Sequence, residues 1–130
     1  MTTLWVPGQP APQGSKRHVG GGRMVESSKF LKPWRNLVAQ RARQAGFEPA
    51  TGPIAVAVAF VMRRPLSAPK TKHVHAIRRP DVDKLVRAIL DGLSGIAYAD
   101  DSQVTQLYAE KRLAVTGEDP GALITVRPIP

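Results

Sequence analysis

Carboxylates gather in one short stretch of an otherwise basic chain. The 130 residues carry a formal net charge of +9 and include only ten acidic side chains. Five of these ten lie close together in the sequence: Asp81, Asp83, Asp91, Asp100 and Asp101. Like charges that crowd together destabilise a fold unless a cation lies among them. The cluster therefore predicts a divalent-metal site that faces a polyanion.

A helix is expected to carry the first three of these acids. Pro80 disfavours helix at the preceding residue and suits a helix start, so Asp81 is predicted at or near the N-cap. The apolar residues that follow recur on one face: Leu85, Ala88, Ile89 and Leu93. At about 100° per residue, Asp83, Arg87 and Asp91 share a polar sector on the opposite side.

A simpler interpretation of the same acids is structural. Acids in a first turn often cap a helix and complement its dipole, and Asp81 and Asp83 could both do so. The segment Asp100-Asp101-Ser102 alone would be an ordinary turn. The second pair of acids, close behind the helix, favours the metal site over this interpretation.

Three runs of this region resemble a known family. They begin at Arg78 (RRPDVDKL), Leu90 (LDGL) and Tyr98 (YADDSQV). They resemble the RusA family of Holliday-junction resolvases, whose pattern reads roughly R-x-D-x-D-N-L-x-K-x-x-x-D-x-L and then D-D-x-Q-[VI]. The match is specific from Arg78 to Lys111 and compatible in element order and length over most of the rest. The resemblance implies a small dimeric endonuclease that cuts four-way DNA junctions with Mg²⁺, for which Mn²⁺ is a possible substitute.

The resemblance also implies roles for individual residues. Asp81, Asp83 and Asp101 match the catalytic carboxylates of the family, and Arg87 lies where the family has a catalytic-site lysine. Lys84 replaces the usual asparagine, and Arg87 carries a planar fork in place of a point charge. Neither departure removes a metal ligand, but both leave open how the scissile phosphate is held.

The chemistry expected of these residues is hydrolysis of a phosphodiester. Carboxylates that bind Mg²⁺ provide an activated water and a clamp for the phosphate. We therefore predict that Asp81, Asp83 and Asp101 converge around one or two Mg²⁺ ions. Asp100 would point the other way in an extended segment, so it is predicted to be a minor ligand or to support the site from outside.

Two further roles are predicted on the helix. Arg87 should contact the scissile phosphate or stabilise developing charge. Asp91 could orient Arg87 through an i,i+4 ion pair.

The resemblance and symmetry together predict a homodimer. Two matched cuts in strands of like polarity require two sites related by symmetry, which a homodimer provides.

The composition limits the class of protein. The length fits one domain, and the absence of cysteine excludes a disulfide framework and a thiolate metal site. No signal-peptide pattern or membrane-length apolar run is present, so we expect a cytoplasmic protein with no membrane partner. The resemblance to the RusA family implies a bacterial or phage-encoded, nucleoid-associated protein with no small-molecule cofactor. The pI near 10.7 points to a polyanionic partner. Fourteen of the nineteen Lys and Arg residues lie in the first 80 positions, against two acids.

Two basic segments are predicted to be flexible loops that close on DNA phosphates, residues 8–26 and 63–79. The cations expected to bind DNA are Lys16, Arg17, Arg23, Arg63, Arg64, Lys70, Lys72, Arg78, Arg79 and Lys84. The glycines at 20–22 lack the Gly-Lys-Ser/Thr of a Walker loop. His73 and His75 are better interpreted as loop cations than as metal ligands, because no cysteine or third histidine is near.

The remaining pattern predicts a single compact α+β domain with a small mixed sheet and two main helices, in the order β-α-β-α-β-β. The predicted elements are a strand at 2–6, a helix from Ser27 or Ser28 to about Ala45, a central strand at 54–62, the helix after Pro80, and strands at 104–115 and 122–127. The central strand alternates bulky residues with alanines, which predicts a helix packed on the alanine side. Trp34 is expected in the core, and residues 116–121 are expected to form a hairpin loop with solvated acids.

Three other functions compete with a junction-cutting enzyme. A catalytically inactive protein could bind branched DNA in an architectural role, although the intact aspartates count against it. A basic RNA-binding protein of ribosomal type would explain the charge but not the clustered acids. The third alternative is a nuclease that acts on other branched or flapped DNA, and only a panel of substrates can distinguish it from a junction-cutting enzyme.

Overall fold

Four strands form one mixed sheet in the order β1-β6-β4-β5. The computed structural model describes residues 1–14, 16–19, 23–26 and 29–130, with the side chains of 1–14 and 29–130. The strands of the sheet are β1 (Thr2–Pro7), β4 (Ile54–Met62), β5 (Val104–Leu113) and β6 (Gly121–Pro128). Strand β4 pairs parallel with β5 and antiparallel with β6, which in turn pairs antiparallel with β1. The predicted mixed sheet, with β4 inside it, is confirmed.

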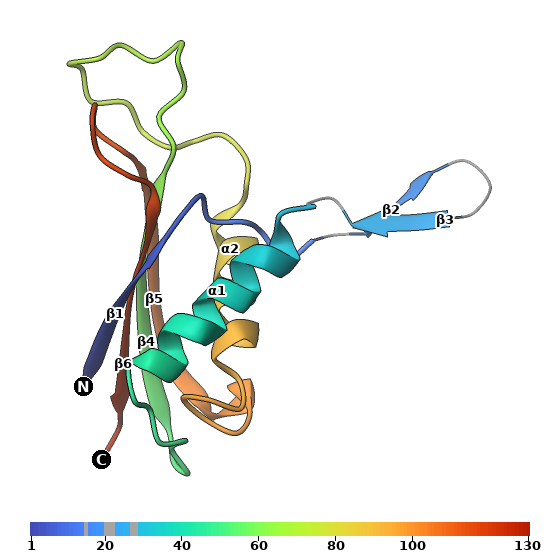
Figure 1. Ribbon diagram of the computed structural model, residues 1–130, viewed down its shortest axis with the longest axis vertical. Coiled ribbons are helices and arrows are strands. Elements are labelled where there is room, and N and C mark those ends of the chain that lie inside the picture. The colour runs from blue at the N-terminus through green and yellow to red at the C-terminus, as the bar shows by residue number, and fades with distance from the viewer. Residues whose placement is uncertain (15, 20–22, 27–28) are drawn as a thin grey trace.

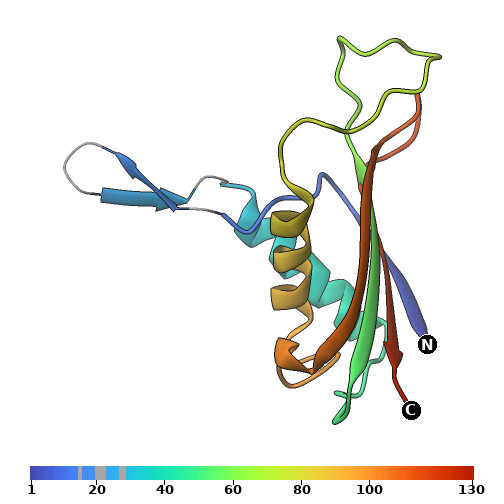
Figure 2. The same cartoon turned by 180° about the vertical axis from the view of Figure 1, so that it is seen from behind.

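The two main helices, α1 (Leu31–Gln44) and α2 (Val82–Leu93), cover one face of this sheet, as Figures 1 and 2 show. The bulky side chains of β4 face the helices and are buried: Ile54, Val56, Val58, Phe60 and Met62. The helices therefore lie opposite the alanine side, and the prediction that they pack on it is wrong. The physical reason is area, since the branched and aromatic side chains bury more apolar surface than alanine does.

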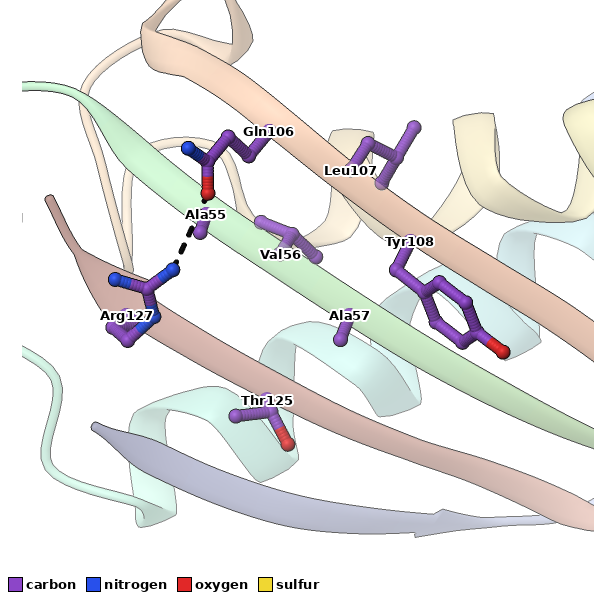
Figure 3. Close-up of a pocket in the computed structure, with 8 residues that line it drawn as sticks. All are labelled: Ala55, Val56, Ala57, Gln106, Leu107, Tyr108, Thr125 and Arg127. Carbon is purple, nitrogen blue, oxygen red and sulfur yellow. Dashed lines mark hydrogen bonds between the residues drawn. The ribbon is translucent and has the colours of Figure 1, made fainter.

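The alanine side of β4 belongs to the face of the sheet that the helices leave open. Figure 3 shows Ala55 and Ala57 in a shallow hollow there, next to Tyr108 and Thr125, with the helices behind the sheet. Arg127 donates a hydrogen bond of 3.3 Å to Gln106 across this hollow. Since no carboxylate lies among the described residues that line it, the hollow is not a candidate for the predicted metal site.

Helix α1 begins later than the sequence suggests. Its N-cap is Phe30, so the predicted cap at Ser27 or Ser28 is wrong, and both serines lie outside the described residues. Pro33 occupies the first turn, where its missing N–H is tolerated. The helix ends before Gly46, whose φ of +77° suits glycine. Trp34 is buried in the core, as predicted.

The predicted flexible loop at 8–26 contains two strands. Strands β2 (Lys16–Val19) and β3 (Arg23–Glu26) pair antiparallel and form a separate two-stranded sheet. Figures 1 and 2 show this hairpin projecting away from the body of the protein. Paired strands carry the basic residues of this segment out from the main sheet, in place of an irregular loop.

The segment between β5 and β6 is not a hairpin loop, because β4 lies between these two strands. One of its two acids, Glu118, also differs from the prediction. Glu118 forms a two-pronged ion pair with Arg112, with both N···O distances at 2.7 Å, and accepts the backbone N–H of Val115 at 3.0 Å. Glu118 thus fixes the start of this connection, while Asp119 is exposed as expected.

Gly92 of α2 lies against Val38 of α1 and provides a test of the packing between the two helices. A Cβ at Gly92 would lie 2.9 Å from Cγ1 of Val38. Gly92→Ala should therefore overpack the interface by about 1–3 kcal/mol, offset by about 1 kcal/mol of better helix propensity. We expect a net loss of about 1 kcal/mol in urea unfolding. Gly52→Ala, which meets no atom within 4 Å, is the control and should leave stability nearly unchanged; a Gly92→Ala variant as stable as the parent would contradict this packing.

The ion pair of Glu118 predicts an acid-sensitive contribution to stability. Arg112 and the Val115 N–H hold the pKa of Glu118 at about 2, below its ordinary 4.5. Because the folded-state pKa is depressed, the pair stabilises the fold above pH 4.5 and loses this contribution as pH falls toward 2. Glu118→Gln should lower the urea midpoint at neutral pH and match the parent near pH 2. Glu48→Gln controls for the loss of one exposed negative charge, and a deficit that persists unchanged in acid would refute the assignment.

Candidate active site

The five clustered acids form two groups at opposite ends of α2. Asp81 and Asp83 lie at its N-terminal end, whereas Asp91, Asp100 and Asp101 lie toward and beyond its C-terminal end. Twelve helical residues span about 18 Å at a rise of 1.5 Å each. Figure 2 shows α2 between the loop that precedes it and the turn before β5.

Strand β5 independently shows that the two groups lie far apart. The 3₁₀ turn η2 (Asp101–Gln103) directly precedes β5, at one end of the strand. Near the other end, Lys111 Nζ donates hydrogen bonds of 2.7 Å each to the carbonyls of Arg78 and Pro80, just before Asp81. From Val104 to Lys111 the strand rises by about 23 Å at 3.3 Å per residue.

The predicted convergence of Asp81, Asp83 and Asp101 therefore does not occur within one copy of the chain. Among residues 1–14 and 29–130, no group of three His, Cys, Asp or Glu side chains is close enough to hold a metal ion. Carboxylates are suitable ligands for a hard divalent cation, but neither end of α2 brings three such side chains together among the described residues.

The N-terminal group leaves its carboxylates exposed. Asp81 is the N-cap of α2 by its backbone angles, as predicted, but its side chain makes no capping hydrogen bond within the described part of the chain. Its Oδ2 lies 3.9 Å from Nζ of Lys84, and both side chains are substantially exposed. Asp83 lies in the first turn and is exposed as well. The capping interpretation of Asp81 therefore does not hold, and its carboxylate is available to a ligand.

Two contacts hold this end of α2 in place. Lys111 fixes the carbonyls of Arg78 and Pro80, as described above, and the backbone N–H of Gln13 donates to the carbonyl of Lys84 at 2.9 Å. Sequence reasoning missed Lys111 as a site residue. Its only signal was its place at the end of the matched motif, inside a strand of mixed polarity.

The C-terminal group is held by Gln103. Its side-chain oxygen accepts the backbone N–H groups of Ala99 and Asp100 at 3.0 and 3.1 Å. Its side-chain nitrogen donates to the carbonyls of Ala50 and Gly52 at 2.8 and 3.0 Å, just before β4. The glutamine of the D-D-x-Q pattern thus fastens the acidic turn to the main sheet.

The two neighbouring acids of this turn differ in their surroundings. Asp100 Oδ2 accepts a hydrogen bond of 2.7 Å from Ser102 Oγ, so its carboxylate is engaged within the turn. Asp101 is exposed, and its side chain makes no hydrogen bond or ion pair within the described part of the chain, although its backbone carbonyl accepts the N–H of Val104. The carboxylate of Asp101 is therefore the one of the two that no side chain of the turn engages.

A buried tyrosine lies beneath the C-terminal group. The hydroxyl of Tyr98 donates to the carbonyl of Leu90 at 2.8 Å. Burial raises the pKa of Tyr98 far above its ordinary value, and the negative charges of Asp101, Asp91 and Asp100 raise it further. The phenol therefore stays protonated and acts as a structural donor, not as a base.

Arg87 and Asp91 do not form the predicted ion pair. The ion pairs within residues 1–14 and 29–130 are Lys84–Asp81 and Arg112–Glu118. Arg87 is exposed and Asp91 is half-buried. The guanidinium of Arg87, one helical turn after Asp83, is therefore available to an anion.

Most predicted DNA-binding cations of the second loop are exposed: Arg63, Lys70, Lys72, Arg78 and Arg79. Arg64 differs, because its guanidinium donates to the carbonyls of Pro69, Lys72 and Ala114 and holds the loop together. The side chains of Lys16, Arg17 and Arg23 lie outside the described residues.

His73 and His75 contact each other edge to face, with ring centroids 4.6 Å apart. Within the described part of the chain they belong to no group of three His, Cys, Asp or Glu side chains that could hold a metal ion. Neither α1 nor α2, nor any other described helix, combines the length and the apolar character needed to cross a membrane.

Comparisons with known proteins cover both ends of α2. The family model of the endodeoxyribonuclease RusA matches residues 7–127. A Bacillus subtilis (strain 168) protein, the uncharacterized protein YqaN, is 28% identical over 138 residues, which cover 95% of this chain and 94% of the relative. The family match therefore includes the helix, the acidic turn and both basic segments.

The role of Gln103 can be tested by truncation. Gln103→Ala would leave the peptide groups around Ala50, Gly52, Ala99 and Asp100 without their shared partner, so we expect a loss of about 1–3 kcal/mol in unfolding free energy. The control is Gln106→Ala, three residues further along the chain in β5, whose side chain makes one 3.3 Å bond on the open face. It should change stability by no more than about 0.5 kcal/mol. Equal effects of the two truncations in urea unfolding would rule out the fastening role.

Proposed function

The chain belongs to the family of the endodeoxyribonuclease RusA, whose family model matches residues 7–127, and we propose that it resolves Holliday junctions as a Mg²⁺-dependent homodimer. Membership supports a junction-resolving endonuclease that needs a divalent metal. The finer proposal concerns the identity of the metal, the dimer and the residues that act. It rests on one observation: α2 holds two incomplete groups of carboxylates at its opposite ends.

A two-fold dimer can complete both groups at once. If the α2 helices of two copies run antiparallel about an axis near their middle, the N-terminal end of each faces η2 of the other. Asp81 and Asp83 of one subunit then meet Asp101 of the partner subunit, and symmetry repeats the arrangement at the other end. The two sites would lie roughly one helix length apart, about 18 Å. Two equivalent sites provide the two matched cuts that resolution requires.

Each residue has a distinct part in this proposal. Asp81 and Asp83, with Asp101 of the partner subunit, hold the cation, and Asp100 supports the turn that carries Asp101. When bound, Mg²⁺ supplies positive charge against the phosphate and lowers the pKa of a water. Arg87 binds the scissile phosphate with its planar fork and stabilises the charge that develops there. Its exposed position, one turn from Asp83, supports this assignment.

The basic surface supports the choice of substrate. The exposed cations Arg63, Lys70, Lys72, Arg78 and Arg79 precede Asp81 directly in the chain, so a DNA backbone bound along them leads to the acids. Binding through such contacts depends strongly on salt and carries little sequence information. The acids, not the cations, therefore separate this proposal from a general nucleic-acid-binding protein.

Mixing two inactive variants tests the shared site. Asp83→Asn and Asp101→Asn should each reduce cleavage of a labelled synthetic junction by more than the 10- to 100-fold typical of residues around a metal, because both remove a ligand. A mixed dimer contains one Asp83→Asn subunit and one Asp101→Asn subunit. Both substitutions then fall in the same shared site, and the other site is intact. A one-to-one mixture after random exchange should therefore recover about a quarter of the active sites. The recovered product should be a nick in a single strand.

Controls separate this result from trivial causes. Asp119→Asn removes an exposed acid from the connection between β5 and β6, outside both acidic groups, and should cleave like the parent. Both inactive variants should still bind the junction, measured by gel shift at fixed salt without divalent metal. A mixture that stays inactive although mass spectrometry detects mixed dimers would refute the shared site, and a parent protein that leaves junctions uncut with Mg²⁺ would refute the enzyme.

A further inference from the structure

A cavity beside the N-terminal end of α2 has no part in the proposed chemistry. It lies between the loop at 63–80 and the ends of β4 and β5, with a volume of about 530 Å³. Pockets for small ligands typically have about 300–1,000 Å³, so this cavity has the size of a binding site. Its wall is largely apolar: Met62, Pro65, Ala68, Val74, Ala76 and Leu113.

Cations line the same cavity. Arg63, Arg78, Arg79 and Lys111 contribute to its lining, together with His75, and no acid does so among the described residues. An apolar wall beside guanidinium and ammonium groups fits a ligand with a flat apolar body and an attached anion. A nucleotide has this combination, since its base is flat and its phosphate is charged.

The position of the cavity relates it to the acids of α2. Pro80 is part of the lining and is the residue directly before Asp81. A DNA strand whose phosphate lies at Asp81 and Asp83 therefore has an adjacent nucleotide within reach of the cavity. This step rests on the proposed function, because it takes that phosphate to be the scissile one.

Hydrogen bonds within the chain hold the loop that walls the cavity. Lys111 Nζ holds the carbonyls of Arg78 and Pro80 at 2.7 Å each, and Thr116 Oγ1 donates to the carbonyl of Lys70 at 2.7 Å. Arg64 donates to the carbonyls of Lys72 and Ala114 at 2.7 and 3.3 Å. A site held in place by such bonds loses little conformational freedom on binding.

We propose that this cavity receives one unstacked nucleobase from the strand held at the N-terminal end of α2. Extruding a base from an intact duplex requires unpairing and unstacking, which cost least where pairing is already disturbed. A branch point offers such a base and a continuous duplex does not. The cavity would thus favour junctions over duplex DNA through the state of one nucleotide, without reading a base sequence.

Fluorescence of a base analogue tests whether a base leaves the stack. Synthetic four-way junctions carry 2-aminopurine at one position each, within a few nucleotides of the branch, and are bound without divalent metal so that no cleavage occurs. Wild-type protein should raise the emission severalfold at one position near the scissile phosphate. Ala76→Phe and Ala68→Leu fill the cavity from two sides and should abolish this rise, whereas Ala45→Phe, at an exposed position on the end of α1, should retain it.

An abasic junction separates the base from the rest of the site. The filled variants should cleave the intact junction about 5- to 100-fold more slowly than wild type, by analogy with the loss of one base-stacking contact. On a junction that lacks the base at the position found by fluorescence, they should cleave as fast as wild type. Recovery on the abasic substrate also shows that the variants are folded.

Several results would overturn the proposal. These are no change of emission at any position although the junction is bound, filled variants that cleave the intact junction at the wild-type rate, or an equal defect on both substrates. The fluorescence experiment needs binding only, so it still tests the cavity if cleavage itself is absent. A wild-type protein that unstacks a base but never cuts would refute the proposed enzyme and leave the base site standing.

Discussion

The length of α2 is the constraint on which the site depends. The helix is fixed along one side by Leu85, Ile89 and Leu93, all fully buried, and Gly92 allows α1 to approach closely. A helix packed in this way cannot shorten or bend to bring its ends together, because its rise per residue is set by its hydrogen bonds. Asp83 and Asp101 therefore keep a separation of about one helix length in every copy of the chain.

Strand β5 fixes the position of both ends of helix α2. Gln103, directly before the strand, holds the acidic turn, and Lys111, seven residues into it, holds the backbone before Asp81. These two side chains do different work from the aspartates, because they bind backbone groups and set positions. The helix and the strand thus form a frame in which the two acidic groups face outward at a fixed distance.

Local sequence patterns predicted the elements of this frame well. Pro80 before Asp81 gave the N-cap of α2, the alternation from Ile54 to Met62 gave the inner strand, and the apolar stripe gave Trp34 its place in the core. These features depend on the spacing of residues within one element. Spacing within one element does not give the distance between residues on different elements. The separation of Asp101 from Asp81 was therefore not predicted.

The errors have the same origin. Alternation along β4 shows that the strand has two different faces but not which of them the helices cover. A turn after β5 suggests that β6 pairs with β5, whereas β6 pairs with β4. The segments that pair in the basic hairpin, Lys16–Val19 and Arg23–Glu26, show no regular alternation of apolar and polar residues in the sequence, so periodicity did not predict these strands. Glu118 looked like a turn residue because its partner, Arg112, precedes the turn and belongs to the strand.

The separation of the acids also changes the argument from charge. Crowded carboxylates predicted that one chain would need a cation to relieve their repulsion, yet each chain keeps its two groups apart and avoids the crowding. Under the proposed dimer, the crowding arises only where two subunits meet, so the cation and the second subunit become mutually dependent. A ligand that binds only the assembled form stabilises that form in proportion to its occupancy. Metal binding would then strengthen the association of subunits, and a chain acting alone would hold neither a complete site nor the ion.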